Sequence, residues 1–286
     1  MSEPRLLGIF AHPDDESFGS GGTLARYTRE GIEVHVCTVT NGAAGSYDPA
    51  KPVPDAHEAL AQRRAQELRC ACHVLDARLH TLDYRDSGME NTPDNHHPDS
   101  LYQADLEDVA RDLTRVMRAV RPHVVITHDA TGGYFHPDHI RVNHAVRRAW
   151  HRVGDVHAYP KLRAAGYPPW RPARLYETVI PRSSLKWFIR IQRLLGRDPR
   201  RFGQNQDIDL TQVGVPGTRI HVRLDVGPFV AIKEQASACH KSQGGNRTFQ
   251  WMPGFVRRRL QRYEHFVQIY PPGAQRHNDL FEGLDK

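Results

Sequence analysis

Cysteine is scarce in this sequence: the 286 residues include four, Cys37, Cys70, Cys72 and Cys239. They are too few and too scattered for a disulfide framework, and none belongs to a CxxC pair. Cys70 and Cys72 are two positions apart on a predicted helix and so face different sides of it, which argues against shared metal binding. We therefore expect the cysteines to be small buried apolar residues or unreactive thiols.

Long apolar runs are also absent. Nowhere do about 18 or more apolar residues follow one another, the usual length of a membrane span. Residues 1–5 lack the basic segment and the long apolar stretch of a secretion signal. We expect a soluble, cytoplasmic protein with no membrane partner.

Lysine is rare, with six among the 39 basic residues, although the formal net charge is +6. The basic residues are spread along the chain instead of forming one stripe with interleaved aromatic residues, which argues against a nucleic-acid partner. The densest groups are Arg257–Arg259 with Arg262, and a smaller run around Arg197, Arg200 and Arg201. Such groups are typical of solvated helix faces or of partners for carboxylates in the same chain.

The sequence does contain a regular alternation of short apolar runs and amphipathic stretches in its first half. This pattern is typical of βαβ units around a parallel sheet. We predict an α/β fold with a Rossmann-like, mostly parallel sheet flanked by helices. It forms one domain over 1–286, in which 1–150 carry the core and 151–286 complete a cleft. The predicted strands are 6–11, 32–39, 73–82, 123–127, 175–180, 219–224 and 266–270. The predicted helices are 56–72, 101–120, 140–150 and 229–242, with a first helix between Gly21-Gly22-Thr23 and Gly31.

Two His-Pro-Asp motifs follow predicted strands. The first is His12-Pro13-Asp14-Asp15, at the end of strand 6–11, and the second is His136-Pro137-Asp138-His139, after strand 123–127 and a glycine-containing loop. In a doubly wound sheet with the order 3-2-1-4-5, the first and fourth strands are neighbours at the topological switch point. We therefore expect the two motifs to face each other across a crevice.

Together the motifs offer ligands for a divalent metal ion. His12 and Asp15 are the natural pair from the first motif, which leaves Asp14 beside the metal but free. In the second motif, one of His136 and His139 binds the metal while the other points at what the metal binds. Two histidines and one aspartate with open positions are typical of a hydrolytic zinc site, and Fe(II) or Mn(II) would also accept them.

Two other motifs have simpler interpretations. His96-His97-Pro98-Asp99 has no predicted strand before it, so we interpret it as loop and helix-capping material. Gly19-Ser20-Gly21-Gly22 lacks the GxGxxG spacing of a dinucleotide site, and Glu33 opens the second strand instead of closing it. These glycines are expected to let the first helix pack closely on the sheet.

The motifs resemble the LmbE-like (PIG-L) family of zinc-dependent N-deacetylases, which remove acetyl groups from N-acetylglucosamine conjugates. The resemblance is carried by residues 11–16, 21–23, 40–45, Arg64 with Glu67, 86–89, 133–139 and 233–243, and is weakest over 152–217. It implies an amide hydrolase that uses Zn²⁺, or Fe²⁺ or another divalent metal, on a small amino-sugar substrate. It also implies that His12, Asp15 and His139 are the metal ligands and that Asp14 is the general base.

The resemblance extends to residues around the metal. His136 is expected to stabilise the oxyanion or to protonate the leaving amine, with Asp138 orienting it. Tyr134 is expected to approach the substrate carbonyl. The implied sugar contacts are Arg64, Asp86 and Ser87.

The segment Asp86-Ser87-Gly88-Met89 resembles the mycothiol-pathway branch of the family. Members of that branch act on N-acetylglucosaminyl-inositol or cleave mycothiol S-conjugates, and bacillithiol-pathway deacetylases are a further alternative. From another functional class, a catalytically inactive sugar-binding relative would keep the same crevice. Ala43 stands where many relatives carry Glu, a departure that bears on substrate fit and not on metal chemistry.

Several C-terminal residues have two interpretations. Lys233, His240 and Gln243 either reach the substrate or belong to a buried helix. We expect the sugar aglycone and the acyl group to be selected by the loops 83–100 and 196–217, the second being an exposed excursion or lid. A homo-oligomer is left open.

Overall fold

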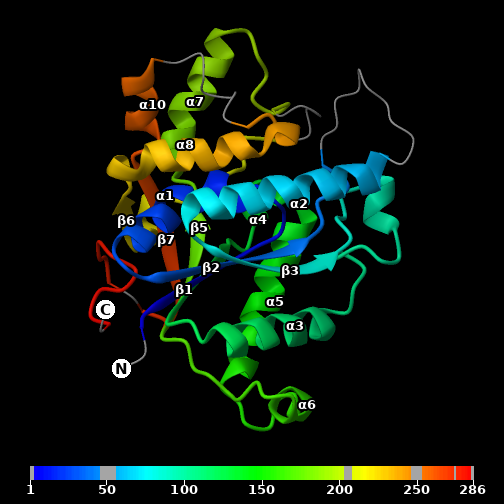
Figure 1. Ribbon diagram of the computed structural model, residues 1–286. Coiled ribbons are helices and arrows are strands. Elements are labelled where there is room, and N and C mark those ends of the chain that lie inside the picture. Colours follow the sequence, from blue (N-terminus) through cyan, green and yellow to red (C-terminus); the bar gives the residue numbers. More distant parts are fainter. Residues whose placement is uncertain (1–2, 46–55, 203–207, 246–252, 274, 285–286) are drawn as a thin grey trace.

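A computed structural model gives the structure of the chain and describes residues 3–45, 56–202, 208–245, 253–273 and 275–284. Within these residues, seven strands form one sheet with the order β3-β2-β1-β4-β5-β7-β6 (Figure 1). The parallel strands are β1 (Arg5–Phe10), β2 (Glu33–Thr40), β3 (Arg78–Tyr84), β4 (Val124–His128) and β5 (Arg174–Val179). β7 (Tyr263–Tyr270) and β6 (Val222–Asp225) extend the sheet in antiparallel pairing. The predicted α/β class and the order 3-2-1-4-5 are confirmed.

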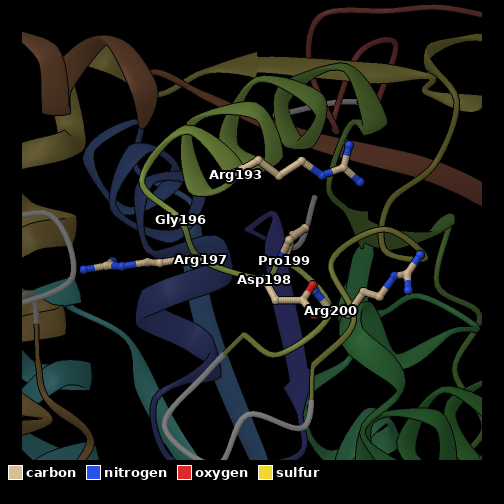
Figure 2. Close-up of a pocket in the computed structure, with 6 residues that line it drawn as sticks. All are labelled: Arg193, Gly196, Arg197, Asp198, Pro199 and Arg200. Carbon is tan, nitrogen blue, oxygen red and sulfur yellow. The ribbon is translucent and has the colours of Figure 1, made fainter.

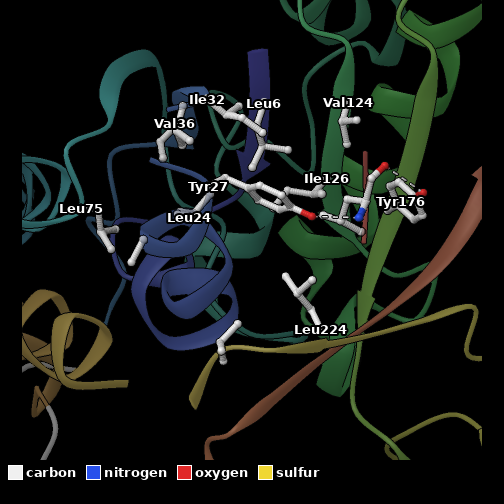
Figure 3. Close-up of a cluster of buried hydrophobic side chains, with 14 of the residues drawn as sticks. Leu6, Leu24, Tyr27, Ile32, Val36, Leu75, Val124, Ile126, Tyr176 and Leu224 are labelled. Atoms are coloured by element: carbon white, nitrogen blue, oxygen red, sulfur yellow. Dashed lines mark hydrogen bonds between the residues drawn. The ribbon is translucent and has the colours of Figure 1, made fainter. Parts of the chain in front are cut away.

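Helices cover both faces of the sheet (Figure 1). One face carries α1 (Asp15–Arg29), α2 (Ala56–Leu75) and α8 (Val230–Cys239), and the other carries α3 (Leu106–Val120) and α5 (Pro137–Val153). Successive strand side chains point to opposite faces, so Leu6 packs into the first core and Leu7 into the second. Figure 3 shows the first core, where the Tyr27 hydroxyl accepts a hydrogen bond from the Leu280 N–H at 2.8 Å.

Shorter helices belong mainly to the C-terminal half. They are α4 (Gly132–Phe135), α6 (Pro160–Ala164), α7 (Arg182–Leu194) and α10 (Gly254–Leu260), with 3₁₀ turns at Pro93–His96, Gly217–Arg219, Gly227–Phe229 and Lys241–Gln243. Neither α7 nor α10 was predicted from the sequence. Among the described helices, none combines the length and the apolar character that a bilayer crossing requires.

The first helix begins earlier than the sequence suggested. α1 starts at Asp15 and contains Gly21 and Gly22 in its interior, whereas we expected the helix to follow these glycines. A Cβ atom on Gly22 would lie 2.7 Å from Val226 and 3.0 Å from the Glu264 carboxylate. Close packing is therefore their role, as expected, but the partner at Gly22 is the segment after β6 together with β7.

The expectation for two of the cysteines is wrong. Cys70 of α2 and Cys239 of α8 form a disulfide with their Cα atoms 5.8 Å apart. Their sequence separation is 169 residues, and only the packing of α2 beside α8 brings them together. Cys37 and Cys72 are buried free thiols, as predicted.

Candidate active site

The carboxyl ends of β1 and β4 bring the two His-Pro-Asp motifs together. The strands are parallel neighbours, with Leu6 opposite Val124, so both end at the same edge of the sheet. The first motif continues directly from β1, and the second follows β4 after α4. As a result, Nδ1 of His12 lies 3.1 Å from Nε2 of His139.

The three predicted metal ligands lie around one point. The Asp15 carboxylate is 3.6 Å from Nδ1 of His12 and 3.4 Å from Nε2 of His139. Nδ1 of His139 lies 3.1 Å from the Gly132 carbonyl oxygen, and donation to this oxygen would leave the Nε2 lone pair facing His12 and Asp15. Burial lowers the pKa of His139 well below its ordinary value, so the ring stays neutral. Among the described residues, three groups could hold a metal ion: His12 with His136 and His139, Asp15 with His128 and His139, and His12 with Asp86 and Asp138. The predicted ligands His12, Asp15 and His139 are divided between the first two groups, which share His139 and together offer imidazole and carboxylate donors.

The site also concentrates negative charge. Burial lowers the pKa of His12, but the carboxylates of Asp86, Asp138 and Asp15 outweigh it and hold this pKa well above its ordinary value. Burial also raises the pKa of Asp15, but the neighbouring histidines, His139 foremost, bring it well below its ordinary value. A cluster that stabilises positive charge at its centre to this degree suits a bound cation.

The backbone conformation of Asp14 directs its carboxylate to Arg64 and not to the histidines that surround Asp15. It precedes α1 with φ 130° and ψ −26°, and its N–H donates to the Glu16 carboxylate at 2.9 Å. Its own carboxylate accepts from the Arg64 guanidinium at 3.1 Å, while Arg64 also donates to the Pro13 carbonyl at 2.6 Å and to the Gly42 carbonyl at 2.9 Å. Burial raises the pKa of Asp14 to about 7, against the opposing effect of Arg64. Asp14 is thus a carboxyl group that exchanges a proton near neutral pH.

His136 lies on the other side of His12. It caps α5, and its Nδ1 accepts the Asp138 N–H at 3.2 Å. The ring centroids of His136 and His12 are 4.5 Å apart. Burial, followed by the charge of His12, lowers the pKa of His136 to about 3. The ring is therefore neutral, and its proton is on Nε2.

The expected contact between the Asp138 side chain and His136 is not made. The Asp138 carboxylate lies 3.2 Å from Nε2 of His12 and accepts the Ser87 N–H at 2.9 Å, and only the Asp138 backbone contacts His136. Asp138 lies in the first turn of α5. Its N–H points back to the cap residue His136, while its side chain points to His12, which follows β1. Asp138 orients His12 instead.

Tyr134 lies beside both histidines of the second motif. Its ring centroid is 5.3 Å from that of His139 and 5.9 Å from that of His136. It is placed by α4, in which Gly133 has φ 72° and interrupts the helical backbone. Burial raises the pKa of the Tyr134 phenol, so the hydroxyl is a hydrogen-bond donor at neutral pH.

The predicted sugar contacts Arg64, Asp86 and Ser87 are all buried at the site. One Asp86 oxygen lies 3.5 Å from Nε2 of His12 and the other 3.9 Å from Arg64. The Ser87 hydroxyl accepts the Tyr102 N–H at 2.9 Å. Each of them therefore also organises the protein side of the site.

Sequence reasoning missed His128. Its Nε2 accepts the Ala11 N–H at 2.9 Å and lies 3.4 Å from the Asp15 carboxylate, and its ring stacks on His139 at a centroid distance of 3.8 Å. It also belongs to a group with the half-buried Asp15 and the buried His139 that could hold a metal. The available signal was its position directly after the predicted strand 123–127, and the structure extends β4 by one residue to include it.

The three C-terminal residues divide between ion pairs within the protein and the lining of the cleft. Lys233 and His240 are both buried. Lys233 pairs with Glu264 at 2.6 Å, and His240 pairs with Glu16 of α1 at 2.7 Å. Glu264 also accepts the N–H groups of Gly22 and Thr23, so both pairs help to position α1. Lys233 and Gln243 both line the cleft, so either could still reach a substrate, whereas His240 is fully buried.

A cleft of about 1560 Å³ opens beside the site. Asp14, Asp15 and His139 are among the residues that line it, as are Trp187 of α7 and Leu260 of α10. Residues from both halves of the chain thus enclose one space.

Comparison with known proteins gives a consistent set of relatives. The family model PIG-L, described as GlcNAc-PI de-N-acetylase, matches residues 7–150. A 1D-myo-inositol 2-acetamido-2-deoxy-alpha-D-glucopyranoside deacetylase of Thermobispora bispora is 36% identical over 251 residues, covering 85% of this chain and 80% of the relative. A protein of the same name from Thermobifida fusca is 33% identical and covers 99% of this chain and 98% of the relative.

Two solved structures share the fold. The N,N'-diacetylchitobiose deacetylase of Pyrococcus horikoshii superposes with a TM-score of 0.64 at 20% identity, covering 94% of this chain and 84% of that protein. A 4-carboxy-2-hydroxymuconate hydratase of Pseudomonas putida has a TM-score of 0.62 at 17% identity, with 96% and 99% covered. One fold therefore carries different reactions, and the reaction must be argued from the site.

Proposed function

Because the chain belongs to the PIG-L family of GlcNAc-PI de-N-acetylases, we propose that it hydrolyses the N-acetyl group of a small molecule that contains N-acetylglucosamine. One observation carries the proposal: His12, Asp15 and His139 surround one point, while Asp14 beside them is held by Arg64 and kept free of that group.

The donor set fits a divalent cation, and zinc above all. Two imidazoles and one carboxylate, with open positions left over, are the ligands of many hydrolytic zinc sites, and Fe²⁺ would also accept them. Metal binding would displace the proton that the neighbouring carboxylates favour on His12, because a ligating imidazole must be neutral. His12, Asp15 and His139 would hold the ion. Once bound, it would polarise the acetyl carbonyl and bring the pKa of water toward about 7.

Asp14 is the proton carrier in this proposal. As water attacks the acetyl carbon, the Asp14 carboxylate takes the proton that the water loses. When the C–N bond breaks, Asp14 returns that proton to the departing nitrogen, so that acetate and a free amine leave. A pKa raised to about 7 by burial suits both steps, because the group is neither fully ionised nor fully protonated near neutral pH.

His136 and Tyr134 act on the oxyanion. With Nδ1 occupied by the Asp138 N–H, the His136 ring presents Nε2–H as a donor, and its lowered pKa keeps the ring neutral. It therefore stabilises the tetrahedral oxyanion by a hydrogen bond instead of protonating the amine. The Tyr134 hydroxyl is a second donor. Loss of one such donor typically costs about 3 kcal/mol of barrier.

The first substrate to test is the one named for the relatives, 1D-myo-inositol 2-acetamido-2-deoxy-alpha-D-glucopyranoside. Removal of metal with a chelator should abolish acetate release, and Zn²⁺ should restore it. Hydrolysis that is indifferent to the chelator would overturn the metal-dependent reaction. A series of N-acetylglucosaminides that differ only in the aglycone then defines the substrate, and a mycothiol S-conjugate tests amidase activity.

A further inference from the structure

Helix α7 has two apolar faces. One face packs into the protein: Leu185 contacts the cluster of Leu210 and Val213. The opposite face is open to solvent, and its apolar residues are Trp187 (68% exposed), Ile191 (38%), Leu194 (86%) and Leu195 (60%). Spacing of four and seven positions from Trp187 places Ile191 and Leu194 on the same side of the helix, and Leu195 follows directly as its C-cap. We call these four residues the α7 stripe.

Positive charge flanks the α7 stripe. Lys186, Arg190 and Arg193 are exposed on the same helix, and residues 182–197 include no acidic side chain. An exposed apolar stripe beside basic residues, with a tryptophan among them, is the pattern of helices that lie in a membrane interface.

Helix α10 carries a second group of exposed apolar and basic residues. Phe255 is 71% exposed and Leu260 is 60% exposed, and Arg258 and Arg259 are exposed between them. Trp187 and Leu260 line the same cleft. Each helix therefore contributes an exposed apolar residue to this cleft, and α10 adds Arg259.

The arginines at the end of α7 do not form a site for a single anion. A pocket of about 450 Å³ is lined by Arg193, Arg197 and Arg200 together with one acidic residue, Asp198. Figure 2 shows the three guanidinium groups pointing in different directions. Diverging charges suit a surface that carries many separate negative groups.

We propose that the α7 stripe and the exposed residues of α10 dock on a bilayer that contains anionic phospholipid. Trp187 and the leucines enter the headgroup region, and the arginines face the lipid phosphates. Charge decides against a second copy of the chain, because packing stripe on stripe would bring basic residues against basic residues. The absence of a membrane partner expected from the sequence rested on the lack of a spanning segment, and peripheral docking requires none. This proposal goes beyond the deacetylation reaction and does not depend on it.

Co-sedimentation of the full chain with vesicles tests the proposal. Binding is expected to vesicles of phosphatidylcholine with phosphatidylglycerol, to be weak on phosphatidylcholine alone, and to fall with added salt. Replacing both leucines, Leu194→Ser with Leu195→Ser, should lower the partition coefficient about tenfold or more. The matched control is Val156→Ser, since Val156 is 52% exposed and lies between α5 and α6, away from the stripe.

Retained folding of the double variant is checked by its denaturant unfolding curve, since both leucines are exposed and lie outside the cleft lining. Three results would overturn the proposal. These are no binding to the anionic vesicles, equal binding by the double variant, and a dimer in the absence of lipid that the double variant abolishes. The last result would assign the stripe to a second copy of the chain.

Discussion

Asp14 and Asp15 are neighbours with different surroundings, and the backbone of Asp14 accounts for the difference. A φ of 130° is uncommon outside glycine and costs on the order of 1–3 kcal/mol. The Glu16 carboxylate offsets this strain by accepting the Asp14 N–H, and Glu16 is itself paired with the buried His240. The Asp14 carboxylate therefore contacts the Arg64 guanidinium, whereas the Asp15 carboxylate lies beside His12 and His139.

The pH dependence of turnover tests the role of Asp14. Burial raises its pKa to about 7, and the group must be ionised to take a proton. The predicted kcat/KM therefore falls as the pH drops through about 7, by about tenfold for each further pH unit. A pH–rate profile over this range provides the measurement, and a profile that is flat through it would contradict the assignment.

Arg64→Gln distinguishes two roles for that arginine. The Arg64 charge lowers the pKa of Asp14, so its removal should move the acidic limb of the kcat/KM profile to higher pH. If Arg64 only binds the sugar, KM rises and the limb stays in place. Arg63→Gln is the matched control, because Arg63 is exposed on the same helix.

At the scale of single residues, the sequence predicts which side chains carry the chemistry better than it predicts the contacts that these side chains make. Both motifs predicted the residues that meet at the site. The contacts of Asp138 and His128 depend on where the first turn of α5 and the last residue of β4 point, which sequence spacing does not specify.

At the scale of elements, the strands were the easier prediction. A buried parallel strand is a short, nearly continuous apolar run, and β1 and β4 stand out for that reason. Helix α7 was missed because its apolar residues divide between a core face and an exposed face, so no single stripe marks it. The predicted start of α1 lies too late in the chain because Gly21 and Gly22 suggested a loop before the helix.

Gly22→Ala tests the packing of α1. Its Cβ would meet Val226 at 2.7 Å, so we expect a loss of about 1–3 kcal/mol in the free energy of unfolding. Gly19→Ala is the control, because nothing lies within 4 Å of a Cβ at that position of the same helix, and it should gain up to about 1 kcal/mol. Urea unfolding measures both, and equal effects would refute the packing account.

At the scale of the whole molecule, the disulfide ties together helices far apart in the sequence. Cys70–Cys239 closes a loop of 169 residues, and its removal by Cys239→Ser should cost about 2–4 kcal/mol of stability. Reductant should lower the unfolding midpoint of the wild-type chain and leave that of the variant unchanged. Equal sensitivity of both proteins would show that the crosslink does not stabilise the fold.

The cleft is also a property of the whole chain. The part of the cleft that the two His-Pro-Asp motifs line could be predicted, because the order of the parallel strands brings both motifs to one edge of the sheet. Its walls could not, because α7, α10 and the antiparallel strands are positioned by long-range packing. We expect these walls to select the aglycone, and the predicted loop 196–217 contributes Phe202 and Leu210 to them.

The central claim is that His139 holds the metal and Asp14 moves the proton. Metal content and acetate release, measured together on Asp14→Asn and His139→Ala, test it most directly, with His97→Ala of the third His-Pro-Asp segment as the control. We predict that Asp14→Asn retains one metal ion per chain and loses about 10²- to 10⁴-fold in kcat, whereas His139→Ala loses the metal and the activity together. Normal turnover by Asp14→Asn, or full metal content in His139→Ala, would contradict the account.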